Sequence, residues 1–261
     1  MGFYEATATE QASDRTWKST IQPGWDIGGN ANGGYLLALG GRAMAAAADR
    51  PDVATLTAHF LRPGVAGPVQ TEIDVIKAGR RFTTARGTMS GDQPVLALLG
   101  SFTDHAGSSD EPQFLLEQEP AFPRPEDCDR ILPTDTFPPP IMGQVDLRLH
   151  PDDDFYNGPS GTPLIRGWVK LAETDSWDTI GLLLAADVFP PTIFNADFGV
   201  AWVPTIELTV HVRHRPAPGW LKCHFSSRFV TGGFVEEDGL IWDSGGALVA
   251  QSRQISLLPR A

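Results

Sequence analysis

The chain has 261 residues, of which 41% are apolar, so it is long enough and apolar enough to bury a substantial core. It carries 32 acidic and 20 basic residues, and its formal net charge of -12 argues against nucleic acid or an anionic membrane surface as the main partner. Its two cysteines, Cys128 and Cys223, form neither a disulfide framework nor a C-x-x-C metal motif, which favours a reducing compartment.

The start of the chain shows no targeting pattern. The first residues, MGFYEATATEQASDRTWKS, lack a basic start followed by an apolar run. No stretch reaches the roughly 18 to 20 apolar residues that a bilayer span requires. We therefore expect a cytoplasmic protein with no membrane partner.

The first half of the sequence predicts strands around one helix. FYEATA and TWKSTI alternate with period two and predict a hairpin-like opening. Residues 33–48 are rich in Ala and Leu and are followed by Asp49-Arg50-Pro51, which predicts a helix that ends there. Strands joined by turn residues are expected next, in LTAHFLR, PVQTEIDVIK, RFTTARGTM and PVLALLGSF.

The segment GGNANGG, residues 28–34, precedes the predicted helix. It does not follow a buried strand of a βαβ unit, and the chain contains neither a P-loop nor a G-x-S-x-G motif. A flexible loop that enters a helix explains it most simply. However, Gly33 and Gly34 lie at the helix start, where free N–H groups and the positive dipole end favour an anion or a polarised carbonyl, so both are candidate oxyanion contacts.

The second half repeats the plan of the first. Residues 105–143 are rich in Pro and acidic residues and predict a linker between two units, 1–104 and 144–261. The second unit opens with QVDLRLH and LIRGWVKLA, and a helix follows that Asp175, Ser176 or Asp178 could cap and Pro190-Pro191 would stop. The later strands are expected in TIELTVHVRH, WLKCHFSSRFV, FVEEDGLIW and ALVAQSRQISLL.

Matching segments show that the two halves are an internal repeat. Thr57 of LTAHF and Thr209 of LTVHV are separated by 209 − 57 = 152 residues, and His59 and His211 by the same interval. One helix against one antiparallel sheet, written twice, predicts a duplicated α+β unit. Duplication explains the two histidines more simply than catalysis does, and nothing in the sequence indicates a metal site.

Asp187 is the strongest candidate for catalysis. In GLLLAADVF it follows Leu183 by four positions and Leu184 by three, so on a helix it would share a face with leucines. Burial there would raise the pKa of its carboxyl group, which suits a general base. The alternative, which the sequence supports equally well, is that Asp187 lies at the helix end just before Pro190 and points to solvent. The equivalent position in the first unit is Gly40, so the fold does not require an acid.

Thr205 and Gln254 are weaker candidates by themselves. Thr205 follows Pro204 at the start of a strand and could be an ordinary β-branched strand residue. Gln254 has the same strand parity as Ala250 and Ser252, which would place its amide on a face of small side chains. A buried amide needs partners, and Asp187 or an intervening water could provide one.

The segment around FLRPG, residues 60–64, and the strands that follow it resemble the acyl-CoA thioesterase II family over most of the chain except the linker. The resemblance implies a double hotdog fold, with two tandem units that each have a long helix wrapped by a curved antiparallel sheet. It also implies a catalytic Asp, Thr and Gln, which fall on Asp187, Thr205 and Gln254. The segment after the Asp, VFPPTIF, departs from the family pattern.

The resemblance implies hydrolysis of a fatty or related acyl-CoA to the free acid and CoA, without a metal or cofactor. Two alternatives remain open, a hotdog-fold hydratase of enoyl-CoA and a non-catalytic acyl-CoA-binding protein. A hydratase would need an Asp and His pair near the helix entry, and Asp26 has no histidine near it in sequence. A sheet edge or an exposed helix face could build a homo-oligomer.

Overall fold

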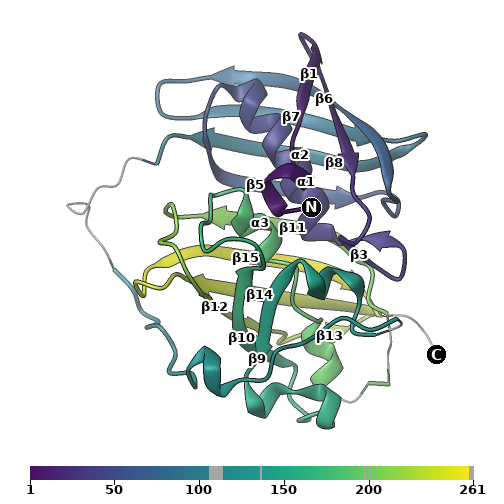
Figure 1. Cartoon of the computed structure of the whole chain (residues 1–261). Helices are drawn as coiled ribbons and strands as arrows, with labels where there is room; N and C mark the ends of the chain where they lie inside the picture. The colour runs from purple at the N-terminus through teal and green to yellow at the C-terminus, as the bar shows by residue number, and fades with distance from the viewer. Residues whose placement is uncertain (106–113, 136, 197, 200–201, 259–261) are drawn as a thin grey trace.

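The structure is a computed structural model that describes residues 1–105, 114–135, 137–196, 198–199 and 202–258. Part of the predicted linker, residues 106–113 and 136, lies outside the described residues. Figure 1 shows two halves, one above the other, that correspond to the beginning and the end of the chain.

The N-terminal half contains one long helix and a sheet that curves around it (Figure 1). The predicted helix over residues 33–48 is confirmed as α2. The predicted strand in FYEATA is wrong, because Phe3–Ala6 form a short helix whose Phe3 and Ala6 are buried. The elements are α1 (Phe3–Ala6), β1 (Glu10–Ser13), β2 (Thr16–Ile21), β3 (Asp26–Ile27), β4 (Asn30–Ala31), α2 (Gly33–Ala48), β5 (Asp52–Phe60), β6 (Gly67–Ala78), β7 (Thr83–Ser90) and β8 (Pro94–Thr103).

The C-terminal half has the same order of strands but a much shorter helix. Its elements are β9 (Val145–Leu149), η3 (Pro151–Asp153), η4 (Phe155–Asn157), β10 (Leu164–Leu171), α3 (Gly181–Ala185), η5 (Thr192–Ala196), β11 (Thr205–Val212), β12 (Leu221–Ser226), β13 (Val230–Thr231), β14 (Phe234–Trp242) and β15 (Leu248–Leu257). Two further turns, η1 (Pro125–Asp127) and η2 (Pro140–Gly143), precede it.

The long helix expected in the second unit is therefore wrong, since α3 has five residues. Of the three proposed caps, Asp178 acts at its start, where Oδ1 accepts a hydrogen bond from the Gly181 N–H at 2.7 Å. At its end the Asp187 N–H turns back to the Leu184 carbonyl at 3.0 Å. Pro190 and Pro191 then prevent a longer helix, because proline has no N–H to donate and clashes with the preceding turn.

Apart from β3 and β4, which pair only with each other, the described strands of both halves join in one antiparallel sheet of thirteen strands, in which β5 pairs with β11. These are the two strands that carry the repeated LTAHF and LTVHV sequences. Thr57 lies opposite Thr209, and on either side Ala58 faces Leu208 and Leu56 faces Val210. The register is thus symmetric about the two threonines, whose Oγ1 atoms are 2.8 Å apart. The two strands that carry the repeated sequence therefore join the two halves of the sheet.

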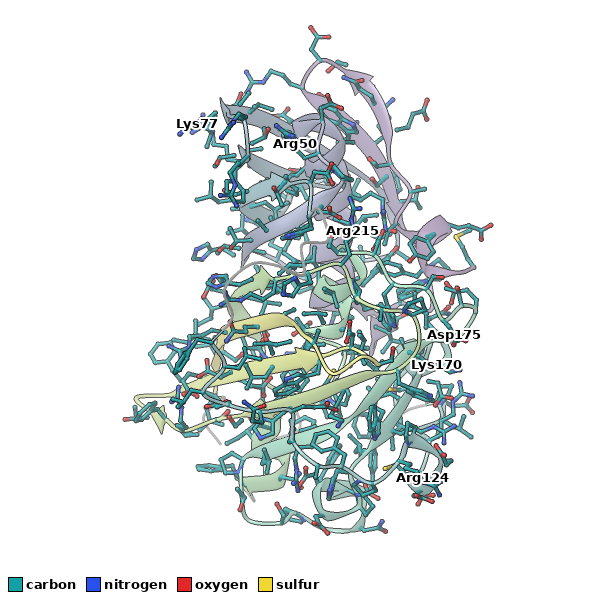
Figure 2. All side chains as sticks on the ribbon, turned by 90° about the vertical axis from the view of Figure 1, so that its left-hand side faces the viewer. Arg50, Lys77, Arg124, Lys170, Asp175 and Arg215 are labelled. Atoms are coloured by element: carbon teal, nitrogen blue, oxygen red, sulfur yellow. The ribbon has the colours of Figure 1, made fainter. Side chains whose placement is uncertain are left out.

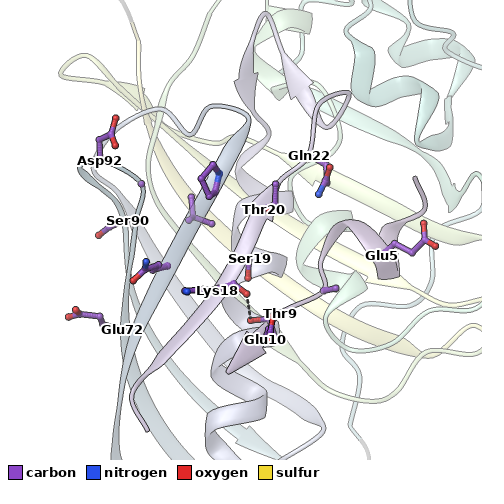
Figure 3. A pocket seen from close by; sticks show the side chains of 15 residues that line it. Glu5, Thr9, Glu10, Lys18, Ser19, Thr20, Gln22, Glu72, Ser90 and Asp92 are labelled. Atoms are coloured by element: carbon purple, nitrogen blue, oxygen red, sulfur yellow. Dashed lines mark hydrogen bonds between the residues drawn. The ribbon is translucent and has the colours of Figure 1, made fainter. Parts of the chain in front are cut away.

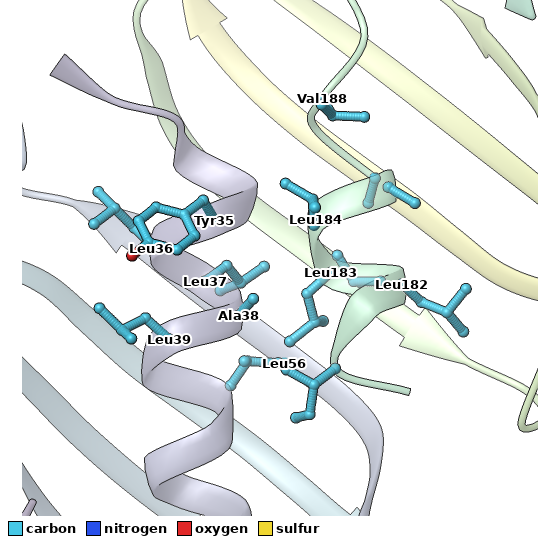
Figure 4. Close-up of a cluster of buried hydrophobic side chains, with 14 of the residues drawn as sticks. Tyr35, Leu36, Leu37, Ala38, Leu39, Leu56, Leu182, Leu183, Leu184 and Val188 are labelled. Atoms are coloured by element: carbon cyan, nitrogen blue, oxygen red, sulfur yellow. The ribbon is translucent and has the colours of Figure 1, made fainter. Parts of the chain in front are cut away.

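Helices α2 and α3 pack against each other (Figure 4). Leu37 and Leu183 are fully buried between them, and Leu56 of β5 joins the same cluster. Gly41 allows this contact, because a Cβ there would lie 2.8 Å from a methyl carbon of Leu183. The apolar face that each helix presents is therefore covered by the other unit as well as by its own sheet.

An ion pair also connects the two halves near β5. Arg215 Nε donates to both carboxylate oxygens of the buried Asp52, at 3.0 and 2.9 Å, and its Nη2 donates to Asp104 at 2.8 Å. Figure 2 shows Arg215 where the upper and lower halves meet. Within the described residues, no helix has both the length and the apolar character needed to cross a bilayer.

Candidate active site

A pocket of about 410 Å³ lies where the start of α2, the corner after β5 and the segment after α3 converge. Its wall is mostly apolar and includes Leu36, Met142 and Val188. Six aromatic residues also line it: Phe60, Phe137, Tyr156, Phe189, Phe194 and Trp202. The polar residues Asp187, Thr205, Gln254 and Glu237 face this same pocket. A mostly apolar cavity with a few convergent polar groups is typical of a small-molecule site.

Asp187 is held at the N-terminal end of α2. Its Oδ2 accepts a hydrogen bond from the Gly34 N–H at 2.7 Å and a second from Asn32 Nδ2 at 3.2 Å. Asn32 Nδ2 also donates to the Asp187 backbone carbonyl at 2.9 Å, while its Oδ1 caps the helix by accepting from the Tyr35 N–H at 2.9 Å. The carboxylate therefore lies at the positive end of a helix dipole.

Gly33 and Gly34 let the two helices approach closely enough for this contact. A Cβ on Gly34 would lie 2.9 Å from the carbonyl oxygens of Leu183 and Leu184, which are backbone atoms that cannot rotate away. A Cβ on Gly33 would lie 2.8 Å from Asp187 Oδ2 and 3.0 Å from the ring of Phe60. The two glycines thus bring the backbone of α2 directly against the carboxylate.

Burial raises the pKa of Asp187 from its usual value of 3.8 to about 7. The negative charge of Glu237 acts in the same direction, while the hydrogen bonds from Gly34 and Asn32 stabilise the charged form and lower the pKa. A carboxylate with a pKa near neutrality can both accept and release a proton at physiological pH, which is the requirement for a general base.

Thr205 and Gln254 lie beside each other on β11 and β15. Thr205 Oγ1 donates to Gln254 Oε1 at 3.0 Å, and Ser256 Oγ donates to Thr205 Oγ1 at 3.4 Å. Gln254 Nε2 donates to Glu237 Oε1 at 2.7 Å. The structure thus brings the three predicted residues Asp187, Thr205 and Gln254 to one pocket, although Gln254 bonds to Glu237 and not to Asp187.

The comparisons with known proteins fit this geometry. Residues 21–103 match the model of an acyl-CoA thioesterase N-terminal domain, and residues 125–258 match that of an acyl-CoA thioesterase C-terminal domain. The second match alone spans more than half of the chain. The chain belongs to the acyl-CoA thioesterase family. It is a thioester hydrolase.

Solved structures are similar to this chain over nearly its whole length. A proposed thioesterase II from Thermobifida fusca is 30% identical, with a TM-score of 0.89 over 99% of this chain and 97% of that one. An acyl-CoA thioesterase II from Mycobacterium marinum is 20% identical, with a TM-score of 0.76 over 100% and 99% of the two chains. A hot dog fold protein of unknown function from Alicyclobacillus acidocaldarius is 19% identical, with a TM-score of 0.83 over 99% and 98%. The thioesterase therefore has a hotdog fold.

Two polar residues of the site were missed in the sequence. Asn32 stands just before a predicted helix, and the preference for Asn at the N-cap could have identified it. Glu237 lies in VEEDG, a run of charges that is typical of a solvent-exposed strand. Its burial, with 8% of its surface exposed, agrees with the period-two alternation of β14, in which Glu237 shares a face with Val235 and Ile241, and this alternation could have identified it.

Two other hollows formed by the described residues contain none of the predicted site residues. A groove of about 860 Å³ beside β2 and β6 is lined by charged side chains such as Glu10, Lys18 and Asp92 (Figure 3). The repeated His59 and His211 are exposed and do not line the apolar pocket. Among the described residues, no group of three His, Cys, Asp or Glu side chains could hold a metal ion.

Proposed function

We propose that this thioesterase hydrolyses a fatty or related acyl-CoA to the free acid and CoA, with a water molecule activated by Asp187 and held by Thr205 and Gln254. One observation carries the proposal. A carboxylate whose pKa is about 7 and a Thr205–Gln254 hydrogen bond face the same apolar pocket, at the N-terminus of α2. This arrangement combines a base, a water-binding pair and a place for an apolar acyl group.

The two oxygens of Asp187 have different surroundings. The hydrogen bonds from described residues to its carboxylate all end on Oδ2. Oδ1 is then the atom that accepts the proton of the attacking water, while the water oxygen forms a bond to the thioester carbonyl carbon. When the tetrahedral intermediate collapses, the C–S bond breaks, the electron pair leaves with the CoA sulfur, and the proton on Asp187 returns to solvent or to the thiolate. A thiolate is a good leaving group, so a strong general acid is not needed.

Gly33 and Gly34 remain the proposed contacts of the thioester oxygen. The Gly34 N–H donates to Asp187 Oδ2, whereas the Gly33 N–H has no hydrogen-bond partner among the described residues. We therefore assign the principal role to Gly33. Its N–H at the positive end of α2 would stabilise the negative charge that develops on the carbonyl oxygen in the transition state.

Several finer features belong to the same proposal. We infer two hotdog units, residues 1–104 and 144–261, joined by the linker 105–143. The symmetric pairing of β5 with β11 supports a duplicated unit, and the aromatic wall of the pocket supports an apolar acyl group as the part of the substrate bound there. Cytoplasmic location and assembly into a homo-oligomer stay predictions.

A hotdog-fold hydratase fits the pocket less well. Hydration of an enoyl double bond by an Asp and His pair needs a histidine beside the acid, and no histidine is among the described residues that line the pocket. A non-catalytic acyl-CoA-binding protein would not require a carboxylate to be kept in an apolar pocket, where its ionisation costs free energy. Turnover distinguishes both alternatives from the proposal.

The test is release of free thiol from acyl-CoAs of increasing chain length and of aromatic acyl type. Wild type should release thiol from at least one of them, and Asp187→Asn should lower kcat by roughly a hundredfold or more, since a general base is lost. Asp92→Asn is the control, because Asp92 is an exposed turn residue outside the pocket. If wild type releases no thiol, or Asp187→Asn turns over as wild type does, the proposal is wrong.

A further inference from the structure

Glu237 is a buried carboxylate in the active-site pocket that the proposed chemistry does not use. We propose that Glu237 is a positioning residue that fixes the amide of Gln254 in one orientation, and thereby sets the direction of the hydrogen bonds that hold the attacking water. The inference rests on the proposed function, because it concerns the same site.

The strand pairing places the two side chains against each other. Glu237 of β14 lies directly opposite Gln254 of β15. Successive residues of β14 alternate between the inside and the outside, so Glu237 points inward while Glu236 and Asp238 point outward. The contact between Glu237 and Gln254 is therefore built into the sheet and does not depend on a mobile loop.

The chemistry of a carboxylate decides which end of the amide faces it. An ionised Glu237 can only accept hydrogen bonds, so the Nε2 group of Gln254 has to point towards it, at 2.7 Å. The Oε1 atom of Gln254 then faces Thr205 and accepts its hydroxyl proton at 3.0 Å. Glu237 thus fixes the orientation of the Gln254 amide, and that amide in turn fixes the direction of the Thr205 hydroxyl.

This direction suits a nucleophilic water. Because Thr205 donates to Gln254, its remaining lone pairs point away from the amide, and the long contact from Ser256 can use at most one of them. A water that donates one hydrogen to Thr205 and the other to Asp187 keeps a lone pair for the thioester carbon. With the amide reversed, Thr205 would donate to that water instead of accepting from it, which would use one of the two lone pairs of the water and make its oxygen less nucleophilic.

Glu237 is itself held too firmly to serve as the base. One of its oxygens accepts from Gln254, and the other accepts from the Thr192 N–H at 2.8 Å. The Thr192 hydroxyl is in turn 2.6 Å from that of Ser227. Asp187, in contrast, has both its bonds on one oxygen. The two carboxylates of the pocket therefore have different roles, since Glu237 orients an amide and Asp187 accepts a proton.

Glu237 also acts on Asp187 through its charge. Burial raises the pKa of Glu237, and the neighbouring Glu236, which pairs with Arg228, raises it further; hydrogen bonds from Thr192 and Gln254 lower it. The charge of Glu237 contributes to the raised pKa of Asp187. Neutralising Glu237 should therefore let Asp187 ionise at lower pH, an effect that loss of packing alone would not produce.

The experiment is a double-mutant cycle with Glu237→Gln and Gln254→Ala, assayed by thiol release from the best acyl-CoA over a pH series. Glu237→Gln keeps the size of the side chain but allows either amide orientation. We expect its kcat to fall roughly tenfold to a hundredfold, as for a misplaced reactant, with KM within about twofold of wild type. The acidic limb of kcat/KM should move to lower pH. In the Gln254→Ala background, Glu237→Gln should cost little further kcat.

Two more variants separate contact from charge. Glu237→Asp keeps the charge but is too short to hold Gln254, so it should lose kcat while its acidic limb stays at the wild-type position. If Glu237→Gln does not fold, the kcat of Glu237→Asp still tests whether Glu237 positions Gln254. Glu236→Gln is the matched control, since it makes the same change on the outer face of β14, and it should keep wild-type kcat.

The outcomes distinguish the two proposals. Additive losses in the cycle, or wild-type kcat in both Glu237 variants, would overturn the role of Glu237 while an inactive Asp187→Asn still supported the proposed function. A wild-type enzyme that releases no thiol from any acyl-CoA would overturn both. Coupled losses together with an acid shift in Glu237→Gln alone are the expected result.

Discussion

The two halves of the thioesterase have the same order of strands but differ in the helices beside the proposed active site. In the first half, α2 has sixteen residues and Gly40 lies buried inside it. In the second half, α3 has five residues, and the position equivalent to Gly40 is Asp187, beyond the helix end. The first half contributes the helix N-terminus that binds the carboxylate, and the second contributes the carboxylate itself. One site is thus formed by two halves that have the same order of strands but differ in their helices.

The largest effect is expected when an acidic residue is introduced at the equivalent position of the first half. Gly40→Asp should destabilise the protein by about 3–5 kcal/mol, because a charge would be buried without a partner. A Cβ at this position already lies 2.6 Å from a methyl carbon of Leu98 and 3.3 Å from the Met89 methyl. Denaturant unfolding measures the loss.

Gly40→Ala is the matched control for the charge. It adds the same Cβ, which the flexible end of Leu98 can partly accommodate, so it should cost clearly less than Gly40→Asp. Equal stability of Gly40→Asp and wild type would mean that the interior of α2 tolerates an acid as well as the position after α3 does, which contradicts the comparison.

A smaller effect is expected when the acid is removed from the second half. The pKa of Asp187 is about 7 in the folded protein and near 3.8 when unfolded, so between these pH values the folded state binds the extra proton. Stability from this group is present below about pH 4 and is lost as the pH rises through about 7. At pH 8 the free energy of unfolding of Asp187→Asn should therefore exceed that of wild type by on the order of 1–3 kcal/mol, and at pH 4 the two should differ little.

Urea titrations of both proteins at several pH values check this result, and Asp92→Asn should show no such dependence. A variant that is less stable than wild type at pH 8 would show that the carboxylate stabilises the fold. In that case Asp187 would be a structural residue and not a base held at a cost in stability.

The smallest effect concerns the symmetric junction. Thr57 and Thr209 are joined by one hydrogen bond at the centre of the β5–β11 pair, outside the pocket. Thr57→Val should cost about 1 kcal/mol of stability and leave kcat unchanged. Thr55→Val, which removes a hydroxyl on the same strand without a hydrogen bond to a described residue, should cost less. A loss of kcat in Thr57→Val would show that the junction controls the site.

Most strands were predicted from the sequence, because period-two alternation is a local signal that packing preserves. The matched segments 152 residues apart fall on β5 and β11, which pair with each other. The symmetric partnership of Thr57 and Thr209 follows from that repeat. The short α3 was not predicted, since GLLLAA has the composition of a longer helix. Its length depends on the turn at Asp187 and on Pro190-Pro191.

The site was predicted as far as its residue types allow. Asp187 interrupts an apolar run, so its burial could be suspected from its neighbours. Glu237 has the same strand parity as Val235 and Ile241, but it lies among charges in VEEDG, which are typical of an exposed strand. Its partner Gln254 could not be predicted, because the partner depends on strand register, and register is a property of the whole sheet.

The most direct test of the central claim is a single-turnover hydrolysis of an acyl-CoA in water labelled with ¹⁸O. If Asp187 activates a water molecule, the labelled oxygen enters the released acid and the peptide that contains Asp187 stays unlabelled. If Asp187 instead attacks the thioester and water then cleaves the resulting anhydride at the Asp187 carbonyl, the label appears on the Asp187 carboxylate and the released acid is unlabelled. Label on that peptide, or no labelled acid at all, would contradict the mechanism.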